Sequence, residues 1–246
     1  MNEYTALAGS YDRLTYDVEY AEIWAFLKEL LSRAGKTPET VLDLACGTGS
    51  MSVLLAQEGY RVIGVDMSED MLTVAAQKAQ ELENMPFFVC QRMERLRLPY
   101  PVDCAVCCLD SLNYVTDPAD CRKAIARVWK ALRPGGMFLF DVNSPEKLRG
   151  LDGQVFLDED DDVYCVWRAE FDEDENICYY GIDLFRRQGS VWHRSFEEHR
   201  EYAYTVPELT AYLGEAGFTD VRVYGDRKFS PPETGEQRIF ITAVKE

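Results

Sequence analysis

The order of patterns along the chain predicts an α/β fold: a doubly wound, mainly parallel sheet with a small antiparallel β cap. Through about residue 145, short and almost continuous apolar runs alternate with amphipathic helical patterns, which is typical of a parallel sheet covered on both faces. Between about 155 and 204, aromatic runs separated by polar turns indicate antiparallel strands. A chain of 246 residues can bury a sizeable core in one or two domains.

Helix signals divide the first half into its elements. Ser68 is suited to cap one helix, with Glu69 and Asp70 at its positive N-terminal end. Asp117 and Pro118 begin another, which a Pro-Gly-Gly segment ends. The predicted elements are, in order, helix 19–34, strand 41–44, helix 50–58, strand 61–65, helix 68–83, strands 86–90 and 102–108, helix 117–132 and strand 137–142.

After the cap, the second half is predicted to return to the same sheet. Thr205 and Glu208 have the spacing of a capping box, so a helix is expected there, and Gly217 is suited to end it. Two final strands are expected at about 218–224 and 237–244. The predicted boundaries are residues 1–150 and 205–246 for the main domain and 151–204 for the inserted cap.

The charge balance disfavours nucleic acid as a partner. The sequence holds 26 Lys and Arg against 43 Asp and Glu, a net charge of −17. This excess repels a phosphate backbone, and no basic stripe compensates for it. A neutral or cationic small molecule is therefore the expected partner. The acidic run at 157–162 is interpreted as a solvated loop without a function of its own.

No apolar run reaches the roughly 18–20 residues that span a bilayer. The N-terminus also lacks a basic region followed by an apolar one, so no secretory signal is predicted. We expect a soluble, cytoplasmic protein without a membrane partner. The sequence does not predict the oligomeric state.

Eight cysteines are present, and three of them, Cys104, Cys107 and Cys108, fall in one predicted strand. The first two have a spacing that can indicate a metal or redox site. In a strand, however, residues three apart point to opposite faces of the sheet. We therefore expect no metal, and interpret these thiols as small buried hydrophobic groups.

A glycine-rich turn at 45–49 follows the strand at 41–44 and indicates a ligand site. Glycine lets the backbone bend sharply and lets a ligand approach without a Cβ in the way. In open α/β sheets the ligand lies beyond the carboxyl ends of the strands, and the next strand ends in Asp66, which can accept hydrogen bonds from ribose hydroxyls. Ser52 replaces the third glycine of a dinucleotide fingerprint, and the Walker-type lysine of triphosphate sites is missing. A nucleoside-type cofactor of another class is predicted.

These residues resemble class I S-adenosylmethionine-dependent methyltransferases over the whole chain. The resemblance implies a Rossmann-like, seven-stranded methyltransferase sheet whose last strand is antiparallel. It is strongest to a bacterial branch with an inserted β-lid and mostly unassigned substrates. The segments that carry it are Asp43–Gly49, Val65–Ser68 with Met71, Leu132–Gly136, Tyr11-Asp12 and Cys107–Tyr114.

The resemblance implies S-adenosyl-L-methionine as the cofactor and a place for each of its parts. The turn at 45–49 would receive the methionine moiety and Asp66 the ribose, while Met67 would pack on the adenine. Met71 would join it or belong to the core. The implied cofactor-binding residues are Tyr11, Ala45, Cys46, Gly47, Gly49, Asp66, Met67, Met71, Met93, Leu109 and Asp110.

One position departs from the family pattern. Similar proteins carry an aspartate after the third strand, which accepts from the adenine amino group, whereas this chain has Arg92. Arginine has no acceptor. Gln91 or Glu94 would have to replace it, or adenine would be held by the Met93 backbone and packing alone.

Methyl transfer requires an aligned acceptor and a group that takes its proton. Candidate bases are Asp110, Asn113, Tyr114 and His199, although His199 is also interpretable as an exposed strand residue beside glutamates; His193 is interpreted as structural. The predicted function is methyl transfer to nitrogen or oxygen of a small molecule. Alternatives are an RNA or ribosome-associated substrate, a cofactor-binding protein without chemistry and, least favoured, a dehydrogenase. The RNA alternative requires a basic face, built from Arg186, Arg187, Arg194 and Arg200.

Overall fold

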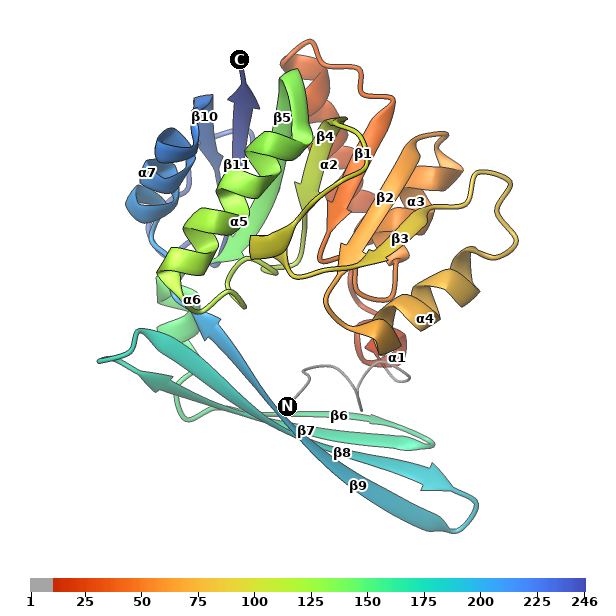
Figure 1. The fold of residues 1–246 in the computed structure, drawn as a ribbon. Coiled ribbons are helices and arrows are strands. Elements are labelled where there is room, and N and C mark those ends of the chain that lie inside the picture. The colour runs from red at the N-terminus through yellow and green to blue at the C-terminus, as the bar shows by residue number, and fades with distance from the viewer. Residues whose placement is uncertain (1–10) are drawn as a thin grey trace.

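The computed structural model describes residues 11–246 and contains two separate sheets (Figure 1). In the larger sheet, neighbouring strands are parallel except that one strand, β11, is antiparallel to both of its neighbours. The predicted seven-stranded, doubly wound sheet with an antiparallel last strand is therefore confirmed. Residues 1–10, which carry the prediction on a secretory signal, lie outside the described residues. The strand order is β10 (Phe218–Tyr224), β11 (Arg238–Lys245), β5 (Leu132–Asn143), β4 (Val102–Cys107), β1 (Thr40–Leu44), β2 (Arg61–Asp66) and β3 (Phe87–Cys90).

Helices cover both faces of this sheet. One apolar cluster joins it to α2 and α3, and another joins it to α5 and α7. No helix within residues 11–246 is long and apolar enough to cross a membrane. The cytoplasmic location stays a prediction from the sequence. The helices are α1 (Tyr11–Leu14), α2 (Tyr20–Arg33), α3 (Ser50–Gln57), α4 (Glu69–Ala79), η1 (Met93–Arg95), α5 (Pro118–Ala131), α6 (Pro145–Gly150) and α7 (Val206–Ala216).

The cysteines of β4 show how the strand divides its side chains between these two clusters. Cys104 belongs to the cluster under α2 and α3, whereas Cys107 belongs to the cluster under α5 and α7. Both side chains are fully buried. The opposite orientation predicted from their spacing is confirmed, and the two thiols cannot share a ligand.

The predicted caps are present where the sequence placed them. The Ser68 hydroxyl accepts from the Met71 amide at 3.3 Å, and the Asp117 carboxylate accepts from Ala119 at 2.8 Å. Thr205 and Glu208 form both bonds of the capping box, and α7 ends at a left-handed glycine. The prediction that α4 extends to about residue 83 is wrong: the helix ends at Ala79, because the following residues form the turn into β3.

The smaller sheet is the antiparallel cap, with the order β6 (Val155–Asp160), β7 (Val163–Asp172), β8 (Ile177–Gln188) and β9 (Val191–Tyr202). The interpretation of 157–162 as a loop is wrong. Its first four residues belong to β6 and pair with β7, and only the last two form the turn. Their carboxylates face solvent while the backbone completes the ladder, so an acidic run remains compatible with an edge strand.

The short helix α1 lies between the cap and the larger sheet. Tyr11 and Leu14 pack against the apolar core of the cap, which includes Val163, Ile182 and Leu184. Figure 1 shows the cap lying across the end of the larger sheet at which α1 sits. The cap and α1 together therefore cover one end of the strands of the main sheet.

Asn113 ties the cap to the main sheet. Its buried amide nitrogen donates to the carbonyl oxygens of Asn143 at 3.2 Å and Tyr202 at 3.0 Å. Its oxygen accepts from the Asn143 amide at 3.1 Å. These bonds join the segment after β4 to the ends of β5 and β9. Asn113 is therefore occupied as a structural link, in contrast to its suggested role as a base.

We predict that Asn113→Ala lowers the free energy of unfolding by about 3 kcal/mol, because it leaves buried backbone groups without partners. Urea denaturation measures this change. Asn84→Ala is the control, since the Asn84 side chain is exposed and bonds one carbonyl, and should cost about 1 kcal/mol or less. Equal losses in the two variants would contradict the linking role of Asn113.

Candidate functional site

A cavity of about 460 Å³ lies at the carboxyl ends of β1, β2 and β4, beneath α1. Most residues predicted to form the site line it, whereas Cys46, Gly49 and His199 do not. The predicted residues in its wall are Tyr11, Ala45, Gly47, Asp66, Met67, Met71, Met93, Leu109, Asp110 and Tyr114.

Gly47 leaves space for a ligand at this cavity. Its φ of +51° is in the left-handed region, and a Cβ built on it would meet no atom within 4 Å. Its amide donates to Asp66 Oδ2 at 2.9 Å. The glycine thus serves two purposes: the backbone turns sharply toward Asp66, and the space beside it stays open.

Gly49 has φ +77°, so it meets the predicted need for a sharply bent backbone, and it also has a packing role. A Cβ at Gly49 would lie 2.8 Å from the Ala75 Cβ of α4, so glycine here permits close packing between helices. Cys46 lines an adjacent small cavity of about 40 Å³, which shares five wall residues with the larger one: Tyr11, Ala45, Gly47, Leu109 and Ser111. Burial raises the pKa of the Cys46 thiol well above its ordinary value. Gly49 therefore acts through packing, whereas Cys46 faces a space next to the main cavity.

Asp66 is fixed by the backbone on both sides. Oδ1 accepts from the Ser68 amide at 2.8 Å and Oδ2 from Gly47. Burial raises the pKa of this carboxyl, while these amides oppose the shift. Each carboxylate oxygen has a second lone pair, so the group can still accept from a ligand hydroxyl.

Asp12 of α1 is bound to residues of the glycine-rich turn and of α4, a set of contacts that we call the Asp12–Lys78 clasp. Asp12 accepts from the Thr48 hydroxyl at 2.6 Å and pairs with Lys78 at 2.8 Å. Lys78 also donates to Ser50 Oγ at 2.8 Å. The clasp keeps Tyr11 in the cavity wall, where burial raises the pKa of its phenol.

Two residues of the segment after β3, Gln91 and Glu94, were suggested to replace the missing aspartate as acceptor for the adenine amino group. Gln91 uses its amide nitrogen and oxygen on the Arg97 backbone, at 3.1 and 2.8 Å. Glu94 pairs with Arg92 at 2.7 Å and its side chain is 10% exposed. Both line the cavity and each keeps a lone pair for a further hydrogen bond, but the Glu94 carboxylate is the stronger acceptor because it is charged.

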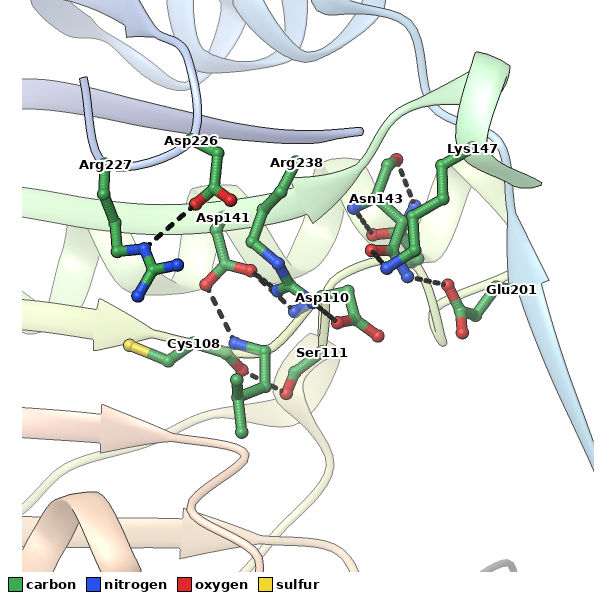
Figure 2. Close-up of polar contacts among 12 residues, drawn as sticks. Cys108, Asp110, Ser111, Asp141, Asn143, Lys147, Glu201, Asp226, Arg227 and Arg238 are labelled. Atoms are coloured by element: carbon green, nitrogen blue, oxygen red, sulfur yellow. Dashed lines mark hydrogen bonds and ion pairs between the residues drawn. The ribbon is translucent and has the colours of Figure 1, made fainter. Parts of the chain in front are cut away.

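Two residues of the site, Asp141 and Arg238, were not found from the sequence. The Asp141 carboxylate, at the end of β5, accepts from the amides of Leu109 and Asp110 at 2.8 and 3.0 Å. Arg238, near the start of β11, pairs with both Asp141 and Asp110 (Figure 2). The sequence carries no local signal for them, because they meet through the pairing of β5 with β11, two strands far apart along the chain.

The prediction that His199 acts as a base in the site meets a geometric obstacle. His199 is fully buried on β9 and does not line the cavity. Its Nε2 lies 3.0 Å from Glu197 Oε2, and its ring packs 6.0 Å from the ring of Tyr114, centroid to centroid. A base must reach the proton that it removes. Among the described residues, His199 packs on Tyr114, which does line the cavity, and the alternative of an exposed position is wrong.

Glu201 is a buried carboxylate two residues further along β9. It accepts from Asn143 Nδ2 at 2.8 Å, and Lys147 donates to Asn143 Oδ1 at 2.7 Å (Figure 2). Burial, followed by the charge of Asp110, raises the pKa of Glu201 to about 8. A glutamate in a predicted strand gave no sequence signal for this position.

Comparison with known proteins identifies the family. A family model described as "Methyltransferase domain" matches residues 41–136. The Bacillus subtilis protein named "Putative methyltransferase YqeM" is 31% identical over 243 residues, which cover 98% of this chain and 97% of that protein. A crystal structure of an S-adenosylmethionine-dependent methyltransferase from Clostridium acetobutylicum is 30% identical, covers 99% of both chains and has a TM-score of 0.88. The chain belongs to the S-adenosylmethionine-dependent methyltransferases.

The same fold occurs in a more distant methyltransferase. The sugar N-methyltransferase KedS8 from Streptoalloteichus has a TM-score of 0.80 over 96% of this chain and 93% of its own. The identity is 19%, so this likeness shows the fold alone.

The residues around the cavity of this methyltransferase fit S-adenosylmethionine in their charge and in the space that they leave at Gly47. Space beside Gly47 is open, and Asp66 is fixed at the cavity wall. The cofactor carries a sulfonium and an ammonium against one carboxylate, so its net charge is positive, and acidic side chains outnumber basic ones around the cavity. The charged residues in the wall are Asp66, Glu94, Asp110, Asp117, Asp120, Arg92 and Arg238.

The raised pKa of Glu201 predicts a pH-dependent stability. The folded chain holds this proton more tightly than the unfolded chain, whose glutamate has the ordinary value of 4.5. Stability is therefore lost as the pH rises from about 4.5 to about 8. Glu201→Gln should remove this contribution. The free energy of unfolding of Glu201→Gln, minus that of the unmodified chain, should therefore be larger at pH 8 than at pH 5.

Urea denaturation across this pH range measures the effect. Glu198→Gln is the control, because Glu198 is exposed on the same strand and pairs with Arg200. Parallel stability curves for Glu201→Gln and the unmodified chain would contradict the assignment of the proton to Glu201.

Proposed function

We propose that this enzyme transfers the methyl group of S-adenosylmethionine to a nitrogen or oxygen atom of a small molecule. The observation that carries the proposal is the double position of Tyr11. This residue lines the cavity and also packs on the core of the cap, so α1 covers the cavity directly and the cap supports α1 from its other side. A roofed cavity admits a small acceptor more readily than a large folded one.

The proposed cofactor contacts follow the positions of the side chains. Asp66 would accept from the ribose hydroxyls, and Met67 would pack on the adenine. Leu109 and Asp110 would meet the amino group. Ala45 and Gly47 would face the methionine moiety, Met71 and Met93 would complete the wall near the adenine, and Tyr11 would close the site. Gly49 would act through packing, and Cys46 would border the space next to the methionine moiety.

When bound, S-adenosylmethionine supplies a methyl group activated by its sulfonium. The chain then has to orient the acceptor, exclude water and take up a proton. Asp110 and Tyr114 line the cavity and are the proposed groups for contact with the acceptor. His199, packed behind Tyr114, would fix the position of that ring.

The alternative of an RNA substrate requires a basic face, and the arginines proposed for it are mostly neutralised. Arg187, Arg194 and Arg200 each pair with a carboxylate of the cap. Paired guanidinium groups have less charge to offer a phosphate backbone. A small-molecule acceptor is therefore favoured. The pairs are Arg187–Asp162 at 2.8 Å, Arg194–Asp183 at 2.6 Å and Arg200–Glu198 at 2.6 Å.

Calorimetric titration with S-adenosylmethionine, and with NAD as the negative ligand, tests the cofactor contact. We expect micromolar binding of the first ligand and none of NAD. Asp66→Ala should weaken binding about tenfold or more, because it removes a charged acceptor. Asp70→Ala is the control, since Asp70 is exposed in the first turn of α4 and does not line the cavity. Unchanged affinity in Asp66→Ala would contradict the ribose contact.

Transfer is tested by incubating the enzyme and labelled S-adenosylmethionine with pools of small amines and alcohols, and separately with RNA. S-adenosylhomocysteine formed with a small-molecule pool alone supports the proposal. Product formed with RNA alone would overturn it.

Glu94 is the proposed acceptor for the adenine amino group. The unmodified chain should then bind S-adenosylhomocysteine about tenfold more tightly than S-inosylhomocysteine, which has a carbonyl in place of that amino group. Glu94→Ala should lose this discrimination. Arg92→Ala is the matched control, because it removes the partner of Glu94 and keeps the acceptor. Discrimination that persists in Glu94→Ala would show that Gln91, the backbone or packing recognises adenine instead.

A further inference from the structure

The turn after β4 has an unusual backbone. Leu109 has φ +57° and Asp110 has φ +52°, so two consecutive residues with side chains lie in the left-handed region. Residues other than glycine rarely adopt this conformation, and two in succession persist only where the surroundings fix them. Both residues line the cavity. Whatever holds this turn therefore also shapes the binding site.

The first group that holds the turn is Asp141. Its side chain is fully buried at the end of β5, and its two oxygens accept from the two successive amides of the turn, at 2.8 and 3.0 Å. A buried carboxylate requires partners for each oxygen, and the left-handed turn points both amides toward it. The strain of the turn and the burial of Asp141 thus satisfy each other.

The second group is Arg238, which reaches the turn from β11. One guanidinium nitrogen pairs with Asp141, and Nη2 donates to Asp110 Oδ1 at 2.7 Å. The Arg238 side chain is 20% exposed and lines the cavity. Figure 2 shows the guanidinium between the two carboxylates, so one residue connects the buried support to the side chain in the cavity wall.

This arrangement leaves one Asp110 oxygen for a ligand. Oδ1 is held by Arg238, whereas Oδ2 accepts no hydrogen bond from any residue within 11–246. The two carboxylates and one guanidinium sum to one negative charge. The cluster therefore presents a single fixed anionic oxygen, suited to an ammonium group.

We propose that Arg238 and Asp141 are positioning residues, which hold Asp110 for the charged amino group on the methionine part of S-adenosylmethionine. This inference rests on the place of Asp110 in the proposed cofactor contacts. Arg238 fixes one carboxylate oxygen and prevents two neighbouring carboxylates from facing each other without a cation. Asp141 fixes the backbone from which the side chain projects. Neither touches the ligand in this role.

The test compares a ligand that carries the amino group with one that lacks it. S-adenosylhomocysteine contains the amino acid part, whereas 5′-methylthioadenosine retains only the nucleoside and a thioether. We expect Arg238→Gln to weaken S-adenosylhomocysteine about 10- to 100-fold and 5′-methylthioadenosine within about twofold. Arg222→Gln is the control, because Arg222 is an exposed arginine on β10 that pairs with Asp220, and it should change neither affinity.

A double-mutant cycle separates positioning from a general structural effect. If Arg238 acts through Asp110, then Arg238→Gln should weaken S-adenosylhomocysteine little further in an Asp110→Asn background. Arg238→Lys, which keeps the charge but loses the two-pronged geometry, should fall between the unmodified chain and Arg238→Gln. If Arg238→Gln does not fold in a thermal melt, the cycle is completed with Arg238→Lys.

Equal loss of both ligands, or additive losses in the cycle, would overturn the proposal, because a structural defect affects the whole cavity. The outcome is separate from that of the proposed function. A chain that binds S-adenosylhomocysteine with the predicted ligand selectivity but methylates no small molecule supports the positioning role and contradicts the proposed function. If the chain methylates a small molecule, but Arg238→Gln weakens both ligands equally, the proposed function is supported and the positioning role is contradicted.

Discussion

The carboxyl edge of the main sheet is organised around one buried carboxylate, that of Asp141. Its oxygens bind two amides of the turn after β4 and the guanidinium of Arg238 from β11. A carboxylate without water is tolerated only with such partners, because desolvation of an unpaired charge costs far more than one hydrogen bond contributes. The three strand ends are therefore held in one arrangement, and the strained turn that faces the cavity depends on it.

The end of β5 also connects the site to the cap. Two residues beyond Asp141, Asn143 forms hydrogen bonds with Asn113 and with Glu201 of the cap. The end of β5 therefore contacts both the turn at the cavity, through Asp141, and the cap, through Asn143. On the opposite flank, the Asp12–Lys78 clasp fixes α1 between the glycine-rich turn and the cap. Hydrogen bonds and ion pairs on both sides of the cavity thus connect the main sheet to the cap and to α1. Tyr11 and Tyr114 complete the wall at this junction.

The sequence was sufficient for features that depend on neighbouring residues. Periodicity, caps and the glycine-rich turn predicted the sheet, the capped starts of the helices and the position of Asp66 at a strand end, because each is encoded within a few residues. It was insufficient where the partner lies far along the chain. Arg238 meets Asp110 across 128 residues, and Glu201 meets Asn143 across 58, through strand pairings that no local pattern reveals. Gly49 and His199 show a different limit of residue type as a signal: each was predicted to belong to the site, and neither lines the cavity, since Gly49 packs against Ala75 and His199 is buried on β9.

A crystal structure of the unmodified chain with S-adenosylhomocysteine tests the central claim most directly. The account predicts the ribose hydroxyls on Asp66, and the amino nitrogen within hydrogen-bond distance of Asp110 Oδ2 while Arg238 remains paired with both carboxylates. A ligand whose amino group lies away from Asp110, or a turn at Leu109 and Asp110 that has left its left-handed conformation, would contradict it.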